Sequence, residues 1–177
     1  MTGRRRLRVA AALAAGVLSA VTAGCAGAEP SVVAYVGGVE ISERQLASAE
    51  QGIKVALPDQ IIPPQAIINV LIQGVIAEQT AAANDIAITD AQREALTAAG
   101  NLAPLLGVPE ARPVAFDVAD QQITAEQIGP ERYLAAIAAT PVTLNPRYGV
   151  LDPQQKVIAT DASGSLAAPV PTPAVPQ

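Results

Sequence analysis

The sequence predicts a mainly α-helical domain with a small β-sheet, in the α+β class. Capping signals at Ser42 and Thr89, each followed by apolar residues at helical spacing, predict that helices begin there. The Gly37-Gly38 pair between two apolar segments predicts a tight β-hairpin, since both glycines accept positive φ. Half of the residues are hydrophobic but only 2% are aromatic, so we expect an aliphatic core.

The first 24 residues have the features of a secretory signal peptide. Arginines fill positions 4–6 and 8, and residues 9–24 carry no charge. This apolar run is shorter than the ~20 residues that a membrane-spanning helix needs. Its end, Thr22-Ala23-Gly24-Cys25, resembles the lipobox of bacterial lipoproteins, with Thr22 where Leu is usual. The resemblance implies cleavage before Cys25 and attachment of diacylglycerol and fatty acid (palmitate) to it.

Two other interpretations of Cys25 stay open: a small buried apolar residue, or a free thiol left by ordinary cleavage. It is the sole cysteine, so an intrachain disulfide is excluded, and the absence of histidine excludes a Cys/His zinc site. We expect no metal and no cofactor.

Loss of the signal segment would remove four of 11 basic residues and no acidic one, taking the net charge from −5 to −9. Such an acidic chain is not expected to bind nucleic acid.

The predicted elements follow in order along the chain. After the hairpin of residues 32–41, a helix starts at Ser42 and ends before Pro58, with Leu46, Ala49 and Ile53 on one face. Pro63-Pro64 opens a second helix that ends near residues 84–85.

The second helix is almost entirely apolar. Such a helix is either the centre of the core or partly an exposed binding face. We expect a candidate face that binds apolar client segments, formed by Ile68, Leu71, Ile72, Val75 and Ile76.

The rest of the chain is less regular. A third helix is expected over residues 90–99, stopped by Gly100, and another over residues 130–140. Residues 101–130 are interrupted by proline and glycine, so only one short helical turn at residues 124–127 is predicted there. Residues 141–161 alternate and turn, with a β-turn at Asp152-Pro153.

The domain is therefore placed at residues 32–161. We expect residues 25–31 to form a tether and residues 162–177, rich in Pro and Ala, to form a disordered tail.

Few residues suggest catalysis. The absence of histidine excludes Ser-His-Asp and Cys-His mechanisms, and no phosphate-binding loop is present. The acidic pairs Asp117 and Asp120, and Glu126 and Glu131, are expected to be solvated surface charges. We therefore expect no enzyme activity.

The segment VAYVGGVEISERQL resembles the opening of the SurA/PrsA chaperone family, with Gly37 where Asn is usual. The segment from residue 66 to 96 is similar to the family's next signature, an apolar helix followed by a capped helix. The matching residues are Ile72, Ile76, Ala82, Ile86, Ile88, Thr89 and Asp90.

The motif Asn145-Pro-Arg-Tyr-Gly149 is similar to one in lipoproteins of high-GC Gram-positive bacteria that carry a SurA N-terminal domain, and we interpret it as a structural turn. The resemblance implies a helical SurA N-terminal-like domain in which late residues return to the first strand. The hairpin alone would leave one strand edge open, and Val142 and Leu144 alternate with Thr143, so we expect residues 142–148 to pair with the hairpin and to place Thr143 beside Tyr35. The resemblance gives a further reason for this pairing.

The resemblance implies an ATP-independent chaperone on the extracytoplasmic face of the cell membrane, holding apolar segments of unfolded or newly secreted proteins. The alternative is a non-catalytic adaptor that docks one envelope partner. A third possibility, a peptidyl-prolyl isomerase, is disfavoured because the chain has no room for a parvulin domain and no histidine. A large contiguous apolar groove would favour the chaperone, and a small polar-rimmed patch the adaptor.

Overall fold

The computed structural model describes residues 31–158. The predicted signal peptide, Cys25 and the tail at 162–177 lie outside these residues, as does nearly all of the tether. The described chain is mainly helical with a three-stranded antiparallel sheet, as the α+β prediction required. Its elements are β1 (Val32–Val36), β2 (Val39–Ser42), α1 (Glu43–Ala56), α2 (Pro64–Ala83), α3 (Asp90–Ala98), η1 (Ala103–Gly107), α4 (Arg112–Ile128), α5 (Pro130–Ala139), β3 (Val142–Leu144) and η2 (Pro146–Tyr148).

The predicted turn and helix starts are confirmed. Gly37 and Gly38 have φ of 54° and 87°, so the β1–β2 hairpin turns through two residues with positive φ. Ser42 caps α1, and its backbone N–H donates to Gln45 Oε1 at 2.8 Å while its own Oγ accepts from the Gln45 N–H. Thr89 and Gln92 form the same capping box at α3.

The predicted return of the chain to the first strand is also confirmed. The strand order is β2-β1-β3, and Tyr35 faces Thr143 in antiparallel register. Asn145 extends the pairing, because its backbone N–H donates to the Val33 carbonyl at 2.9 Å and its Nδ2 donates to the Val32 carbonyl at 3.0 Å. The hairpin alone would be marginal in water, and the third strand supplies the pairing that it lacks.

The motif at residues 145–149 is a structural turn, as predicted. Asn145 Oδ1 accepts from the Arg147 N–H, which caps the short helix η2. The Tyr148 hydroxyl donates to Glu43 Oε1 at 2.9 Å, and Arg147 forms an ion pair with the same carboxylate. The motif therefore holds the C-terminal segment against the start of α1.

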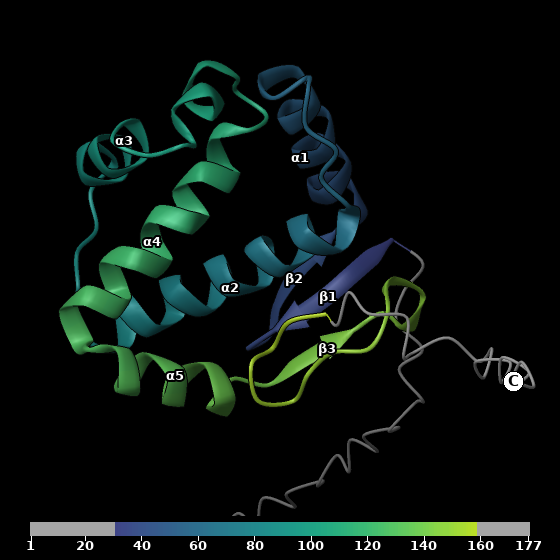
Figure 1. Ribbon diagram of the computed structural model, residues 1–177. Helices are drawn as coiled ribbons and strands as arrows, with labels where there is room; N and C mark the ends of the chain where they lie inside the picture. Colours follow the sequence, from purple (N-terminus) through teal and green to yellow (C-terminus); the bar gives the residue numbers. More distant parts are fainter. Residues whose placement is uncertain (1–30, 159–177) are drawn as a thin grey trace, which may run out of the picture.

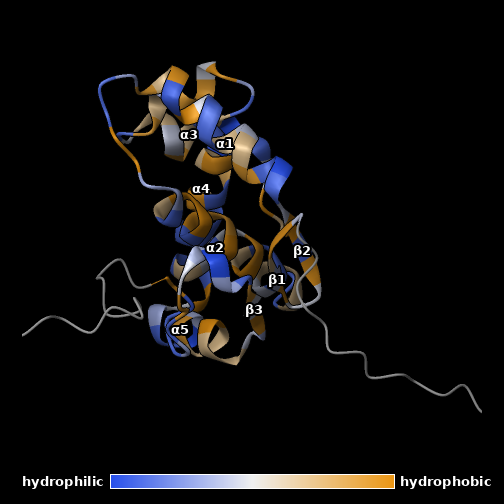
Figure 2. Ribbon diagram, turned by 90° about the vertical axis from the view of Figure 1, so that its right-hand side faces the viewer, coloured by the Kyte–Doolittle hydropathy of each residue, from blue (hydrophilic) through white to orange (hydrophobic). Residues whose placement is uncertain are grey.

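Helix α2 is the centre of the domain. It contacts β1, β2, α1, α4 and α5, and Figure 1 shows it between the sheet and α4. Hydrophobic residues lie along α2 and on the strands beside it (Figure 2). Ile68, Ile72 and Ile76 are fully buried in this core together with Val33, Val36, Ile41 and Leu105.

The polar residues of α2 bind backbone groups of the C-terminal segment and the hairpin. Asn69 Oδ1 accepts from the Ile158 N–H at 2.7 Å, and Gln73 Nε2 donates to the Gln155 carbonyl at 2.8 Å. Gln79 Nε2 donates to the Val36 carbonyl at 3.1 Å. Since burial of an amide is costly unless it is hydrogen-bonded, these contacts explain why an otherwise apolar helix tolerates them.

The middle of the chain was predicted wrongly. In place of one short turn at residues 124–127, the structure has the 17-residue helix α4, preceded by η1. Pro113 lies in the first turn of α4, where its missing N–H breaks no helical hydrogen bond. Gly129, with φ of 88°, ends α4 and begins the separate helix α5.

Candidate functional site

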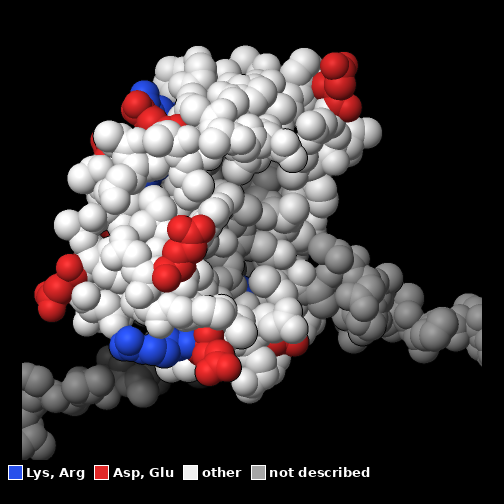
Figure 3. Space-filling view, turned by 60° about the vertical axis from the view of Figure 1, so that its left-hand side comes forward, with Lys and Arg blue, Asp and Glu red and all other residues white. Residues whose placement is uncertain are grey.

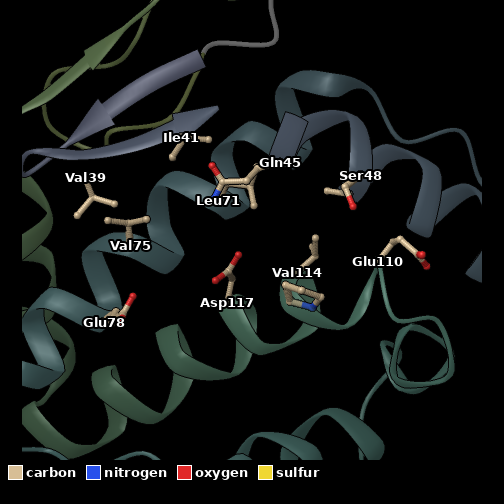
Figure 4. Close-up of a pocket in the computed structure, with 12 residues that line it drawn as sticks. Val39, Ile41, Gln45, Ser48, Leu71, Val75, Glu78, Glu110, Val114 and Asp117 are labelled. Carbon is tan, nitrogen blue, oxygen red and sulfur yellow. The ribbon is translucent and has the colours of Figure 1, made fainter. Parts of the chain in front are cut away.

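A cleft of about 370 Å³ lies between β2, α1, α2 and α4. Its walls are largely aliphatic, and polar or charged side chains stand at its rim and floor (Figure 4). The apolar lining is Val39, Ile41, Ala49, Leu71, Val75, Pro113 and Val114, and the polar lining is Gln45, Ser48, Glu78, Glu110 and Asp117.

The periodicity of each element brings these side chains together. Val39 and Ile41 alternate with Glu40 on β2, so both face the same side of the sheet. Leu71, Val75 and Glu78 recur at helical spacing on α2. Val114 and Asp117 do so on α4, so each element contributes one face to the cleft.

Asp117 points from α4 into the cleft (Figure 4). The helices meet closely here because α2 carries Gly74 at this point, where an added Cβ would lie 2.5 Å from Asp117 Cγ. The pKa of Asp117 is raised to about 7, chiefly by burial and also by the negative charges of Asp120 and Glu78, while the positive charge of Arg93 opposes the rise. Asp117 is thus a carboxyl group that titrates near neutral pH.

The basic side chains closest to Asp117 are engaged by other acids. Arg93 holds Asp120 with two hydrogen bonds, Nε to Oδ1 at 2.7 Å and Nη2 to Oδ2 at 3.1 Å, and it also pairs with Asp90. Arg112 forms an ion pair with Glu94. Within residues 31–158, the Asp117 carboxylate accepts no hydrogen bond and forms no ion pair.

The prediction that Asp117 and Asp120 are solvated surface charges was wrong. Asp120 is only 7% exposed and Asp117 is partly buried, because both lie on the side of α4 that packs against α2 and α3. The error has the same origin as the missed helix, since only the helical spacing of α4 turns these residues inward. Glu126 and Glu131 are exposed, as predicted.

The predicted client-binding face is divided by the structure. Ile68, Ile72 and Ile76 are 0% exposed, because they pack into the core together with buried residues of the sheet and of α4. Leu71 and Val75 are partly exposed and line the cleft. The five residues therefore do not form one continuous exposed surface.

A second apolar surface surrounds the connection from α1 to α2. A hollow of about 120 Å³ there is lined entirely by apolar residues, including Leu57, Ile62, Val70 and Leu102. Ile61, on the neighbouring hollow of about 360 Å³, is 100% exposed. We call the surface formed by these residues the loop surface.

The charge distribution is acidic on the face shown in Figure 3. Acidic side chains are spread over this face, basic ones are few, and an uncharged hollow lies near its centre. Among residues 31–158, no group of three or more potential metal ligands occurs. Helix α2 is long and apolar enough to cross a membrane by length and composition, but half of the qualifying window is buried in the domain, which is typical of a core helix.

Comparison with known proteins identified no relative of this chain. No family model matches the chain, and neither a curated protein nor a solved structure matches it significantly.

Proposed function

We propose that this chain is a lipoprotein, anchored through Cys25 on the extracytoplasmic face of the cell membrane, that binds a polypeptide segment without catalysing a reaction. The lipobox-like sequence supports the anchor, and the resemblance to the SurA/PrsA family supports a role in binding polypeptides. The α+β architecture, with β3 returning to β1, is compatible with that resemblance.

The cleft is the observation that carries the proposal. Ligand sites are typically concave, mostly apolar and supplied with a few polar groups that fix orientation. The cleft has these features, but its volume of about 370 Å³ accommodates only a few side chains. A small polar-rimmed cleft suits one defined segment, so we favour an adaptor that docks one envelope partner.

Chaperone activity is the second candidate, and the loop surface favours it. A fully exposed Ile61 beside an entirely apolar hollow offers non-directional contact to varied apolar segments. Burial of apolar area contributes about 25 cal/mol per Å², so a surface of this size gives weak and unselective holding.

Three matched substitutions distinguish the candidates. Val39→Arg places a bulky charge at the cleft, Ile61→Arg places one on the loop surface, and Val150→Arg serves as the control. These side chains are 46%, 100% and 61% exposed, so none of the changes removes a core contact. Each tagged full chain is recovered from detergent-solubilised membranes, and the proteins that accompany it are quantified by mass spectrometry.

The adaptor proposal predicts one stoichiometric partner that is lost with Val39→Arg and retained with the other two. Many substoichiometric secreted proteins, lost with Ile61→Arg, would instead support the chaperone. If neither substitution changes the recovered proteins relative to Val150→Arg, both surfaces are excluded as binding sites.

A further inference from the structure

The lining of the cleft is unbalanced in charge. Three of its residues, Glu78, Glu110 and Asp117, are acidic, and none is Lys or Arg. Arg93 and Arg112 lie next to this site but are held by Asp120, Asp90 and Glu94. The cleft thus contains an inward-pointing carboxylate whose neighbouring cations are committed elsewhere.

The apolar walls restrict which occupant can balance that charge. A purely aliphatic side chain would fit Val39, Leu71 and Val75 but would bury the Asp117 carboxylate further without a partner, which is costly. An acidic side chain would be repelled. Lys and Arg combine an aliphatic stem with a cationic head, and therefore complement both the walls and the floor.

We propose that the cleft binds a Lys or Arg side chain of the partner's segment, with its stem against Leu71 and Val75 and its cationic head paired with Asp117. This inference rests on the proposed polypeptide-binding function and specifies the chemistry of the partner. Charge complementarity is the observation that selects this occupant.

The position of β2 indicates how such a segment lies. In the order β2-β1-β3, β2 is an edge strand, and among the described residues no strand pairs with its outer side. Val39 and Ile41 of this strand line the cleft. An extended segment that adds to this edge directs alternate side chains into the cleft, which is the usual mode of strand addition.

Binding of this kind depends on pH. The titratable groups facing Asp117 are Glu78 of α2, Asp120 of α4 and Arg93 of α3, with Glu110 on the rim. The residues that β2 and α1 contribute to the lining carry no ionisable side chain. Because the pKa of Asp117 is raised to about 7, the group is mostly neutral at pH 5.5 and mostly ionised at pH 8. A cation pairs only with the ionised form, so affinity rises with pH and binding releases protons.

The test uses a displayed library of random decapeptides selected at pH 8 against the full chain. Three variants are selected in parallel: Asp117→Asn, Val39→Arg and the exposed control Glu131→Gln. Circular dichroism checks that each variant melts cooperatively. The parent and Glu131→Gln are expected to enrich peptides with Lys or Arg between aliphatic residues, and Asp117→Asn is expected to lose that preference.

One enriched peptide is then titrated by fluorescence anisotropy. Its dissociation constant for the parent is expected to rise about tenfold from pH 8 to pH 5.5, and to stay flat for Asp117→Asn. Replacing the basic residue of the peptide with norleucine, which keeps the stem and removes the charge, is expected to weaken binding by a similar factor.

The outcomes separate this inference from the proposed function. Peptides that depend on Val39 but show no preference for Lys or Arg, or keep that preference with Asp117→Asn, would overturn the inference alone. Failure to enrich any peptide over the Val39→Arg chain would overturn both the inference and peptide binding in the cleft.

Discussion

Substitution of Gly74 by Ala tests the close contact between α2 and α4 that positions Asp117. An ideal Cβ at this position would lie 2.5 Å from Asp117 Cγ, 2.5 Å from Oδ1 and 2.6 Å from Cβ. Ordinary contacts between such atoms begin near 3.4 Å. Because Asp117 Cβ is attached directly to the backbone, a change of side-chain rotamer cannot relieve all three contacts, and α4 must move.

The expected loss follows from two opposing effects. Overpacking of a close contact costs about 1–3 kcal/mol, and three short contacts place this site toward the upper end. Replacing Gly by Ala inside a helix contributes about 1 kcal/mol in the opposite direction. We expect a net loss of about 1–2 kcal/mol in the free energy of unfolding, measured by urea denaturation and followed by circular dichroism.

The control is Gly107→Ala in η1, where no atom lies within 4 Å of the added Cβ. This change is expected to leave stability unchanged or to raise it by about 0.4–1 kcal/mol, by reducing the entropy of the unfolded chain. A Gly74→Ala protein as stable as the parent would refute the close approach of the helices. Adding Asp117→Ala, which removes two of the three contacted atoms, is expected to recover part of the loss.

Three other predictions concern the anchor, the closure of the sheet and the carboxyl group in the cleft. Cys25→Ser is expected to abolish partition into the detergent phase and to accumulate uncleaved precursor; retention equal to the parent would disprove lipidation. Deletion of residues 141–177 removes β3 and the contacts of Asn145, so it is expected to abolish cooperative thermal melting, whereas deletion of residues 162–177 is expected to preserve it. Equal melting of the two truncations would contradict the role of β3 in closing the sheet. The pKa of Asp117 is raised on folding, so its contribution to stability is present below its unfolded pKa near 4 and is lost as the pH rises through about 7. Asp117→Asn should therefore be more stable than the parent at pH 8, by at least about 1 kcal/mol, and this difference should be smaller at pH 5. Identical pH profiles of the two proteins would contradict the raised pKa.

The elements predicted best are those fixed by local chemistry. The hairpin turn depends on two glycines with positive φ, and both capped helix starts depend on a hydroxyl and a glutamine three residues later. Each of these signals acts within four residues, so the sequence contains all the information needed. The return of β3 to β1 is a long-range contact, and it was predicted from the open edge of the hairpin and the alternation of Val142 and Leu144, with the family resemblance as a further reason.

Helix α4 was missed because its ends contain proline and glycine. Pro113 and Gly129 were counted as interruptions, whereas each lies at a terminus where it favours the helix: Pro113 in the first turn and Gly129 just past the last. Between them lie 15 residues without proline or glycine, from Val114 to Ile128. With that segment recognised as a helix, the spacing of Val114, Asp117 and Asp120 would have predicted that acidic residues face the core.

The candidate cleft was harder to predict because α2 is apolar on nearly every side. Its residues contact the sheet, α1, α4 and α5, so hydrophobicity alone does not distinguish a core position from a surface position on this helix. The distinction comes from tertiary packing: Ile68, Ile72 and Ile76 face the core, whereas Leu71 and Val75 lie where β2 and α4 diverge. The useful sequence signal on α2 is Gly74, the residue that admits α4 closely enough to place Asp117 at the floor of the cleft. Burial of a carboxylate lowers stability when no cation accompanies it, and within residues 31–158 no cation pairs with Asp117, so this cost is the physical reason for proposing that a bound segment supplies the cation.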